Sequence, residues 1–128
     1  MRIEKIGGKG FRDLLTWQKS KELAVRIYKI SGQDKLSKDY GLRDQIRRSA
    51  VSISSNIAEG DERDTNKESI RFFYIAKGSL AELRTQLEIA HEIGYIEQQL
   101  YSELESMCDE IGRMIGKLIQ TRKERERL

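Results

Sequence analysis

Apolar residues recur along the chain at intervals of three and four, which is the period of an amphipathic α-helix. Four stretches follow this period, and the chain contains no proline that could interrupt them. Short polar segments that contain glycine separate the stretches. The pattern predicts helices over about residues 14–30, 41–59, 65–93 and 97–121.

The second and fourth predicted helices have the most regular apolar seams. Apolar positions are four, four, three and four residues apart in the second helix, and alternate between four and three in the fourth. This spacing is typical of helices that pack in bundles. The short turn at residues 94–96 predicts that the third and fourth helices lie antiparallel. The seams consist of Leu42, Ile46, Ala50, Ile53 and Ile57, and of Leu100, Leu104, Met107, Ile111, Met114 and Leu118.

Capping residues and glycines indicate where the helices begin and end. Asp13 is the expected N-cap of the first helix, and Thr65-Asn66-Lys67-Glu68 is a capping box for the third. Gly60 is expected to end the second helix, and Gln33–Tyr40 to form a polar connection. A glycine inside a helix lowers helix stability by about 1 kcal/mol relative to alanine. Close approach of a neighbouring helix would offset this cost, so we expect it at interior glycines. The interior glycines are Gly78, Gly112 and Gly116.

The length of 128 residues fits one domain. We predict an all-α fold, an antiparallel up-down four-helix bundle over residues 11–121. A flexible N-terminal arm at residues 1–10 and a charged C-terminal tail at residues 122–128 are expected to flank it. No apolar run is long enough to cross a bilayer, and the first ten residues lack the apolar core of a signal peptide. We therefore expect a cytoplasmic protein with no membrane partner.

The chain offers few residues for catalysis. Glu88 and His91 are spaced three apart, as in the di-iron sites of ferritin-like bundles, but such sites need a second histidine and this chain has one. Cys108 is the single cysteine and lies within the apolar pattern, which favours a buried thiol. The serines lack the strand and glycine context of a nucleophile elbow. We predict no enzymatic activity, no cofactor and no metal site.

Positive charge lies mainly in the first half of the chain. The net charge is +3, and residues 1–64 contain 14 Lys and Arg against 10 Asp and Glu. The serine-rich segment 45–60 has two interpretations. In the first, its polar side chains Arg47, Arg48, Ser52 and Asn56 face an RNA phosphate. In the second, which we favour, small residues permit close helix packing, and Asn56 and Glu59 form buried hydrogen bonds with the third helix or another subunit.

Three ordered blocks of sequence resemble a known family. They are FRDLLTWQKSKELAVRIY, LRDQIRRSAVSISSNIAEG and FFYIAKGSLAELRTQLEIAHEIGYI, within about Phe11 to Met114. The blocks closely resemble the small proteins encoded within intervening sequences of 23S ribosomal RNA genes. The resemblance implies a left-handed up-down bundle, a homopentameric ring and a role near ribosomal RNA.

Two functional hypotheses follow. The first is a non-enzymatic homo-oligomer that binds RNA or a ribonucleoprotein through phosphate contacts. The second is a protein–protein adaptor in which the arginines of the second predicted helix pair with Glu59 and Glu82 at subunit contacts. Five basic residues are the candidates for phosphate contact: Arg43, Arg47 and Arg48, helped by Lys19 and Arg26.

Overall fold

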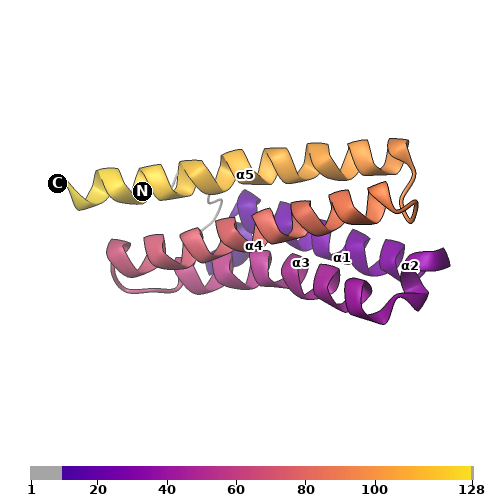
Figure 1. Ribbon diagram of the computed structural model, residues 1–128. Coiled ribbons are helices and arrows are strands. Elements are labelled where there is room, and N and C mark those ends of the chain that lie inside the picture. Colours follow the sequence, from indigo (N-terminus) through magenta and orange to yellow (C-terminus); the bar gives the residue numbers. More distant parts are fainter. Residues whose placement is uncertain (1–9, 128) are drawn as a thin grey trace.

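The computed structural model describes residues 10–127, and this part of the chain is almost entirely helical. A 3-10 turn (η1) at Gly10–Asp13 leads into the first α-helix. The short helix α2 separates the first two long helices (Figure 1). The α-helices are α1 (Leu15–Ser31), α2 (Asp34–Lys38), α3 (Tyr40–Asp61), α4 (Asn66–Glu92) and α5 (Gln98–Glu126).

The four long helices form an up-down bundle. Each packs against the next long helix in the chain, and α1 also contacts α5. The α3–α4 loop and the α4–α5 turn lie at opposite ends of the bundle (Figure 1). A short connection places the next helix antiparallel to the helix before it and in contact with it. The predicted all-α four-helix bundle is confirmed.

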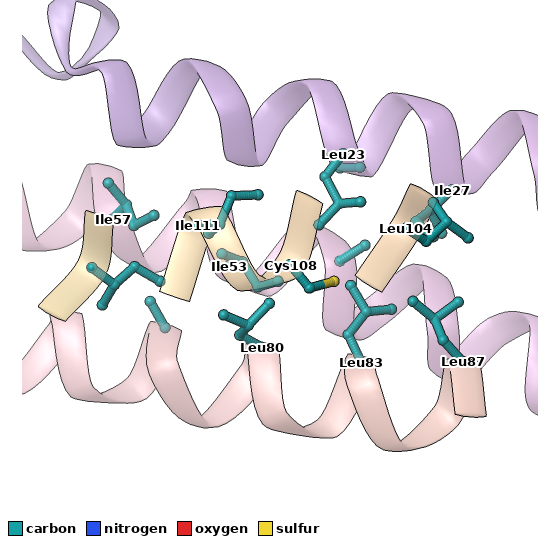
Figure 2. Close-up of a cluster of buried hydrophobic side chains, with 14 of the residues drawn as sticks. Leu23, Ile27, Ile53, Ile57, Leu80, Leu83, Leu87, Leu104, Cys108 and Ile111 are labelled. Carbon is teal, nitrogen blue, oxygen red and sulfur yellow. The ribbon is translucent and has the colours of Figure 1, made fainter. Parts of the chain in front are cut away.

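Aliphatic side chains from all four long helices fill the core (Figure 2). The predicted α3 seam is confirmed, since Ile46, Ala50, Ile53 and Ile57 are buried and Leu42 is partly buried against the core. The predicted buried thiol is also confirmed, because Cys108 is fully buried. Such a seam removes apolar area from water at roughly 25 cal/mol per Å², which is the main term favouring the bundle.

The predicted seam of α5 is partly right. Met107 is partly buried against the core, as Leu42 is, whereas Met114 lies outside the core cluster. Their neighbours Cys108 and Ile115 are fully buried. The helix carries apolar residues in two adjacent phases, and the sequence pattern alone does not rank them. Met107 lies on the α1 side of the helix, where its Sδ is 3.5 Å from Arg26 Nη1.

The predicted helix starts are partly right. Thr65 Oγ1 accepts a hydrogen bond from the Glu68 backbone amide at 3.2 Å, which confirms the threonine cap of α4. Asp13 does not cap α1, because α1 begins at Leu15 and Leu14 occupies the cap position. The expected polar connection 33–40 contains α2 and so is more ordered than predicted. Burial of Leu36, which is 2% exposed, explains this order.

The predicted roles of the glycines are wrong. Gly60 does not end α3, which continues to Asp61. A Cβ at Gly60 would lie 2.6 Å from Phe73 Cε1, so this glycine permits the close approach of α3 and α4. By contrast, a Cβ at Gly78 or Gly116 would meet nothing within 4 Å, and one at Gly112 would meet only Leu80 at 3.4 Å.

The predicted C-terminal tail is also wrong. Helix α5 continues to Glu126, and Arg122 is only 4% exposed. The Arg122 guanidinium donates to Ser69 Oγ at 2.6 Å and lies 3.3 Å from Asp61 Oδ1, so it joins α5 to α3 and α4. The expected flexible arm, residues 1–10, lies outside the described residues except for Gly10. Within residues 10–127, no helix combines the length and the apolar character needed to cross a membrane.

Candidate nucleic-acid interface

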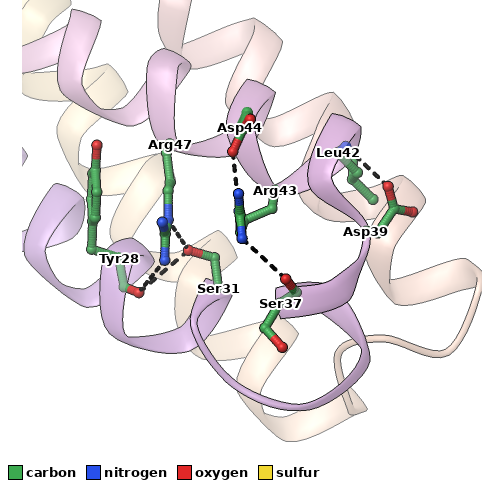
Figure 3. Close-up of polar contacts among 8 residues, drawn as sticks. All are labelled: Tyr28, Ser31, Ser37, Asp39, Leu42, Arg43, Asp44 and Arg47. Atoms are coloured by element: carbon green, nitrogen blue, oxygen red, sulfur yellow. Dashed lines mark hydrogen bonds and ion pairs between the residues drawn. The ribbon is translucent and has the colours of Figure 1, made fainter.

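Arg47 lies where the end of α1 meets α3 (Figure 3). Its Nε donates to Ser31 Oγ at 2.7 Å, and its Nη2 donates to the backbone carbonyl of Tyr28 at 3.2 Å. The carbonyls of a last helical turn lack intrahelical donors and carry partial negative charge, so a cation is favoured there. The same guanidinium lies 4.6 Å from the centre of the Tyr28 ring. These contacts fix the orientation of Arg47.

Arg43 lies one turn earlier on α3 and is held in a similar way (Figure 3). Its Nη1 donates to the carbonyl of Ser37 in the last turn of α2 at 3.1 Å. Its Nε is 3.0 Å from Asp44 Oδ1, and its guanidinium lies 4.7 Å from the centre of the Tyr40 ring. Two arginines thus sit against the ends of two different helices, and each is paired with an aromatic ring.

Arg48 follows Arg47 directly in α3, and its side chain is exposed. In the described part of the chain, no carboxylate lies within ion-pair distance of Arg47 or Arg48. Asp44 is therefore the one acid that pairs with the three α3 arginines within residues 10–127. We call the following set the arginine surface: Arg43, Arg47, Arg48, Tyr28 and Tyr40.

The two tyrosines of this surface are exposed, at 47% for Tyr28 and 66% for Tyr40. An aromatic ring with an arginine on one face can still present its other face to a planar ligand group. Sequence reasoning did not select Tyr40. The available signal was its spacing of three from Arg43, which places both side chains on one helix face.

Lys19 and Arg26 are not part of the arginine surface. Lys19 Nζ lies 3.4 Å from Glu110 Oε1, and Arg26 Nη2 lies 2.9 Å from Glu103 Oε1. Both glutamates belong to α5, so these two basic residues line the seam between α1 and α5. The structure therefore separates them from the three α3 arginines with which they were grouped.

Ser52 and Asn56 lie in the seam between α3 and α4. The Ser52 and Ser79 hydroxyl oxygens are 2.8 Å apart, which links the two helices. Asn56 Nδ2 donates to the Ser52 carbonyl at 2.8 Å and to the Ser52 hydroxyl at 3.0 Å. Within residues 10–127, the predicted hydrogen bond from Asn56 to the following long helix is therefore wrong, because the bond across the helices comes from Ser52 and Asn56 bonds to Ser52 in its own helix. This arrangement favours helix packing as the role of the serine-rich segment.

Glu59 and Glu82 do not meet the arginine surface within the chain. Glu59 Oε2 lies 2.7 Å from Arg63 Nη2, one turn further along α3 and into the following loop. Glu82 is exposed on α4, and among residues 10–127 no basic side chain lies within ion-pair distance of it. Pairing of Glu82 with an arginine of another subunit stays a prediction.

Glu88 and His91 help to close the α4–α5 turn. His91 Nδ1 is 2.8 Å from the carbonyl oxygen of Ile96, and the imidazole stacks on Tyr101 with ring centres 4.5 Å apart. The Tyr101 hydroxyl donates to Glu88 Oε1 at 3.4 Å. Burial, together with the charges of Glu105 and Glu88, raises the pKa of Tyr101. Across residues 10–127, no three His, Cys, Asp or Glu side chains gather in a way that could hold a metal ion.

Sequence reasoning missed three exposed isoleucines. Ile75 and Ile89 lie in α4 and Ile93 is its C-cap, and they are 42%, 47% and 53% exposed. These residues fall outside the phase of the buried α4 positions, and that offset was the signal in the sequence. Singly exposed aliphatic residues such as Ile75 are common, but Ile89 and Ile93 line one hollow together and form a small apolar patch that can bind a partner.

The fold and the site together define a small up-down four-helix bundle protein with an arginine surface at the junction of α1, α2 and α3. Residues 12–117 match the family model described as 23S rRNA-intervening sequence protein, so the chain belongs to this family. The family resemblance read from the sequence is thereby confirmed.

A solved structure shows the same fold. It is the crystal structure of a protein of unknown function from the S23 ribosomal protein family of Bacteroides thetaiotaomicron VPI-5482. The two chains are 29% identical, with a TM-score of 0.76, and the match covers 82% of this chain and 98% of the other. No curated protein sequence matches the chain.

Proposed function

We propose that the protein is a non-enzymatic RNA-binding bundle that contacts phosphate groups through the arginine surface. The observation that carries this proposal is the presence of three arginines within six residues of α3, of which Arg48 is exposed and Arg43 and Arg47 are partly buried, with Asp44 as their one acidic partner within residues 10–127. The family description refers to intervening sequences of 23S rRNA, which makes RNA a natural choice of polyanion.

The geometry of the arginines suits phosphate binding. A guanidinium group presents several N–H donors in a fixed plane, which matches the oxygens of a phosphate. Ser31 and the Tyr28 and Ser37 carbonyls already hold two of these groups in place. Less side-chain entropy is then lost when a ligand binds.

The exposed rings of Tyr28 and Tyr40 add a second kind of contact. Unpaired bases in RNA loops and single strands stack on aromatic rings, at roughly 1–3 kcal/mol per base. Phosphate contacts position a nucleic acid without reading its sequence. We therefore propose a preference for RNA with unpaired bases over fully paired RNA, and little dependence on base identity.

The structure holds Cys108 and His91, the two residues best suited to catalysis, in contacts that do not favour reactivity. Burial raises the pKa of the Cys108 thiol to about 12, so the nucleophilic thiolate is scarce at neutral pH. His91 is held by the Ile96 carbonyl and the Tyr101 ring. These contacts support the non-enzymatic part of the proposal.

The test is a titration of the purified protein into a labelled hairpin RNA from a 23S rRNA intervening sequence, and into an unrelated hairpin of equal length. Each is measured at several salt concentrations. Arg48→Glu is the main variant, because its side chain is exposed and no hydrogen bond or ion pair within residues 10–127 depends on it. We expect weaker binding to both RNAs. The slope of the logarithm of the binding constant against the logarithm of the salt concentration should be smaller in magnitude by about 1 for each phosphate group that the variant no longer binds.

The matched control carries an equal charge change elsewhere. Lys117→Glu replaces an exposed residue of α5 that lies away from the arginine surface. It should bind RNA nearly as well as the parent protein. Absence of binding at low salt, or equal weakening by the two variants, would disprove the proposed site.

A second candidate function is a protein–protein adaptor. The exposed residues Ile89 and Ile93, at the C-terminal end of α4, favour it. An apolar interface depends little on salt, whereas phosphate binding weakens steeply as salt rises. A partner that binds equally well at low and high salt, and that no longer binds when Ile89 is replaced by Asp, would favour the adaptor.

A further inference from the structure

A hollow at one end of the bundle lies between α2 and the α4–α5 turn, and its volume is about 660 Å³. Pockets that hold small ligands commonly measure roughly 300–1,000 Å³. Figure 1 shows α2 and the α4–α5 turn at the same end of the molecule. Side chains of α2, of the turn and of the first turn of α5 line this space, which we call the α2 hollow.

The turn and the start of α5 supply the apolar wall of the hollow. Ile96 is 3% exposed, and Tyr95 and Leu100 are partly buried against the core. The Tyr95 hydroxyl donates to Asp39 Oδ2 at 3.1 Å, which holds that end of the ring in place. A Cβ at Gly94 would meet nothing within 4 Å, so the hollow stays open beside the turn.

Helix α2 supplies the positive charge of the hollow through Lys35 and Lys38. Both side chains are exposed, and a spacing of three places them one turn apart on the helix. In the part of the chain that the structure describes, no carboxylate lies within ion-pair distance of either lysine. Both ammonium groups are therefore free to contact an anionic ligand.

Asp34 and Glu97 are the acids of the hollow. Asp34 has a φ of 53°, a left-handed conformation that is uncommon outside glycine and that clusters at functional sites. Glu97 occupies the N-cap position of α5 without forming a capping hydrogen bond. Among residues 10–127, no basic side chain lies within ion-pair distance of either acid. Both carboxylates can therefore accept hydrogen bonds from the hydroxyl groups of a ligand.

We propose that the α2 hollow binds one ribonucleotide. The phosphate contacts Lys35 and Lys38, the base packs on Tyr95 and Leu100, and the ribose hydroxyls donate to the two carboxylates. Packing of this kind accepts any base, because every base has an apolar π-face. The sugar contact discriminates, since the 2′-hydroxyl is the group that distinguishes RNA from DNA.

The inference rests on the proposed function in one respect, which is that RNA supplies the nucleotide. The arginine surface reaches the hollow through α2, because Arg43 Nη1 donates to the Ser37 carbonyl at 3.1 Å and Lys38 is the next residue. An RNA whose phosphates contact α3 can place an unpaired nucleotide in the hollow. A free ribonucleotide has the same chemistry, so the experiment separates the two sources.

The experiment titrates adenosine 5′-monophosphate (AMP) into the isotope-labelled protein and follows backbone amide shifts by NMR. We expect the largest shifts in α2 and in residues 94–100. The 2′-deoxy analogue should bind about tenfold more weakly, because it lacks one hydroxyl that donates to a carboxylate. Adenosine should also bind more weakly than AMP, because it has no phosphate for the lysines.

Lys35→Glu with Lys38→Glu is the main variant, because both side chains are exposed. It should bind AMP about tenfold more weakly or worse, since two attractive charges become repulsive. Lys67→Glu with Lys117→Glu makes an equal charge change at exposed positions away from the hollow, and it should bind AMP like the parent protein. Circular dichroism verifies that both variants are folded.

Asp34→Gly with Glu97→Ala tests the sugar contact separately. Glycine keeps the left-handed conformation at position 34 without strain. This variant should bind AMP and its 2′-deoxy analogue with equal affinity, because neither carboxylate remains to accept from the 2′-hydroxyl. A purely structural role of the two acids would leave the tenfold preference of the parent protein intact.

The hairpin RNA titration distinguishes this inference from the proposed function. If the nucleotide comes from RNA, the Lys35→Glu and Lys38→Glu variant should bind the hairpin more weakly than the parent. AMP binding in the hollow without RNA binding would identify a free ribonucleotide as the ligand and contradict the proposed function alone. RNA binding without AMP shifts at the hollow, equal affinity of the parent for AMP and its 2′-deoxy analogue, or AMP binding unaffected by the lysine variant would overturn the inference.

Discussion

Gly60 sets how closely α3 approaches α4. The Phe73 ring occupies the place of its missing side chain, with Cε1 at 2.6 Å and Cδ1 at 2.8 Å from an added Cβ, and the Ser69 carbonyl lies 3.1 Å away. A methyl group there cannot be accommodated by moving a flexible side chain alone, because the carbonyl is part of the α4 backbone. The glycine is thus explained by a residue thirteen positions further along the chain.

We expect Gly60→Ala to lower the free energy of unfolding by about 1–3 kcal/mol, as overpacking in a core does. Gly78→Ala is the matched comparison, because its Cβ would enter open space. It should raise the free energy of unfolding by up to about 1 kcal/mol, the helix preference of alanine over glycine. Urea unfolding of both variants measures the difference. Equal effects of the two substitutions would contradict the packing argument.

Cys108 links burial to pH-dependent stability. Burial is the main cause that raises the pKa of its thiol from the usual 9.0 to about 12, with a further contribution from Glu105. Between these values the unfolded chain loses the proton while the folded chain keeps it. The free energy of unfolding should therefore be unaffected by this thiol below pH 9 and fall as the pH rises from 9 to 12.

The expected decrease from Cys108 is about 1.4 kcal/mol per pH unit in that range. Other groups titrate there too, so the measurement is the difference in urea unfolding between the parent protein and Cys108→Ala at each pH. That difference isolates the thiol. A constant difference between pH 8 and pH 11 would show that the thiol is not protected in the folded protein.

At the level of elements, the last two turns of α5 depend on a buried ion pair. Arg122 is 4% exposed and Asp61 is 3% exposed, and Ser69 supplies a further hydrogen bond to the guanidinium. Removing one member of a buried pair leaves a charge in a poorly solvated place, which commonly costs about 3–5 kcal/mol. This contact anchors the C-terminal part of α5 to α3 and α4.

We expect Arg122→Ala to destabilise the protein by about 3 kcal/mol, because the Asp61 carboxylate loses this guanidinium. Amide hydrogen exchange should rise most in the last turns of α5. Lys117→Ala, an exposed α5 residue, should change the stability by no more than about 0.5 kcal/mol. An effect of Arg122→Ala as small as that of the control would show that the pair does not hold the helix end.

The other end of the bundle is joined by Asp39. Its Oδ1 accepts from the Leu42 amide at 3.2 Å and so caps α3, while its Oδ2 accepts from the Tyr95 hydroxyl at 3.1 Å. The hydrogen bond between the Tyr95 hydroxyl and Asp39 is the largest cause of the raised pKa of Tyr95. One aspartate therefore fixes both the start of α3 and the α4–α5 turn.

At the scale of the whole molecule, a modest net charge conceals a strong separation of charge. Acidic residues dominate 82–110, whereas the three α3 arginines and the exposed lysines of α1 lie on other elements.

The sequence determined the helices, their up-down order, the threonine cap at Thr65 and the burial of Cys108. Those features depend on the local period of apolar residues and on short connections, both of which are visible along the chain. It also selected Arg43, Arg47 and Arg48, since three arginines within six residues of one helix stand out.

Only the tertiary structure decided which of two apolar phases α5 buries, why Gly60 is a glycine, that Arg122 is buried, and which basic residues remain available. Each of these outcomes depends on a partner distant in sequence: Phe73 for Gly60, Asp61 and Ser69 for Arg122, and the α5 glutamates for Lys19 and Arg26. Residue periodicity shows which face of a helix is apolar. It does not show which side chain a neighbouring helix places opposite, and that contact sets burial and charge pairing.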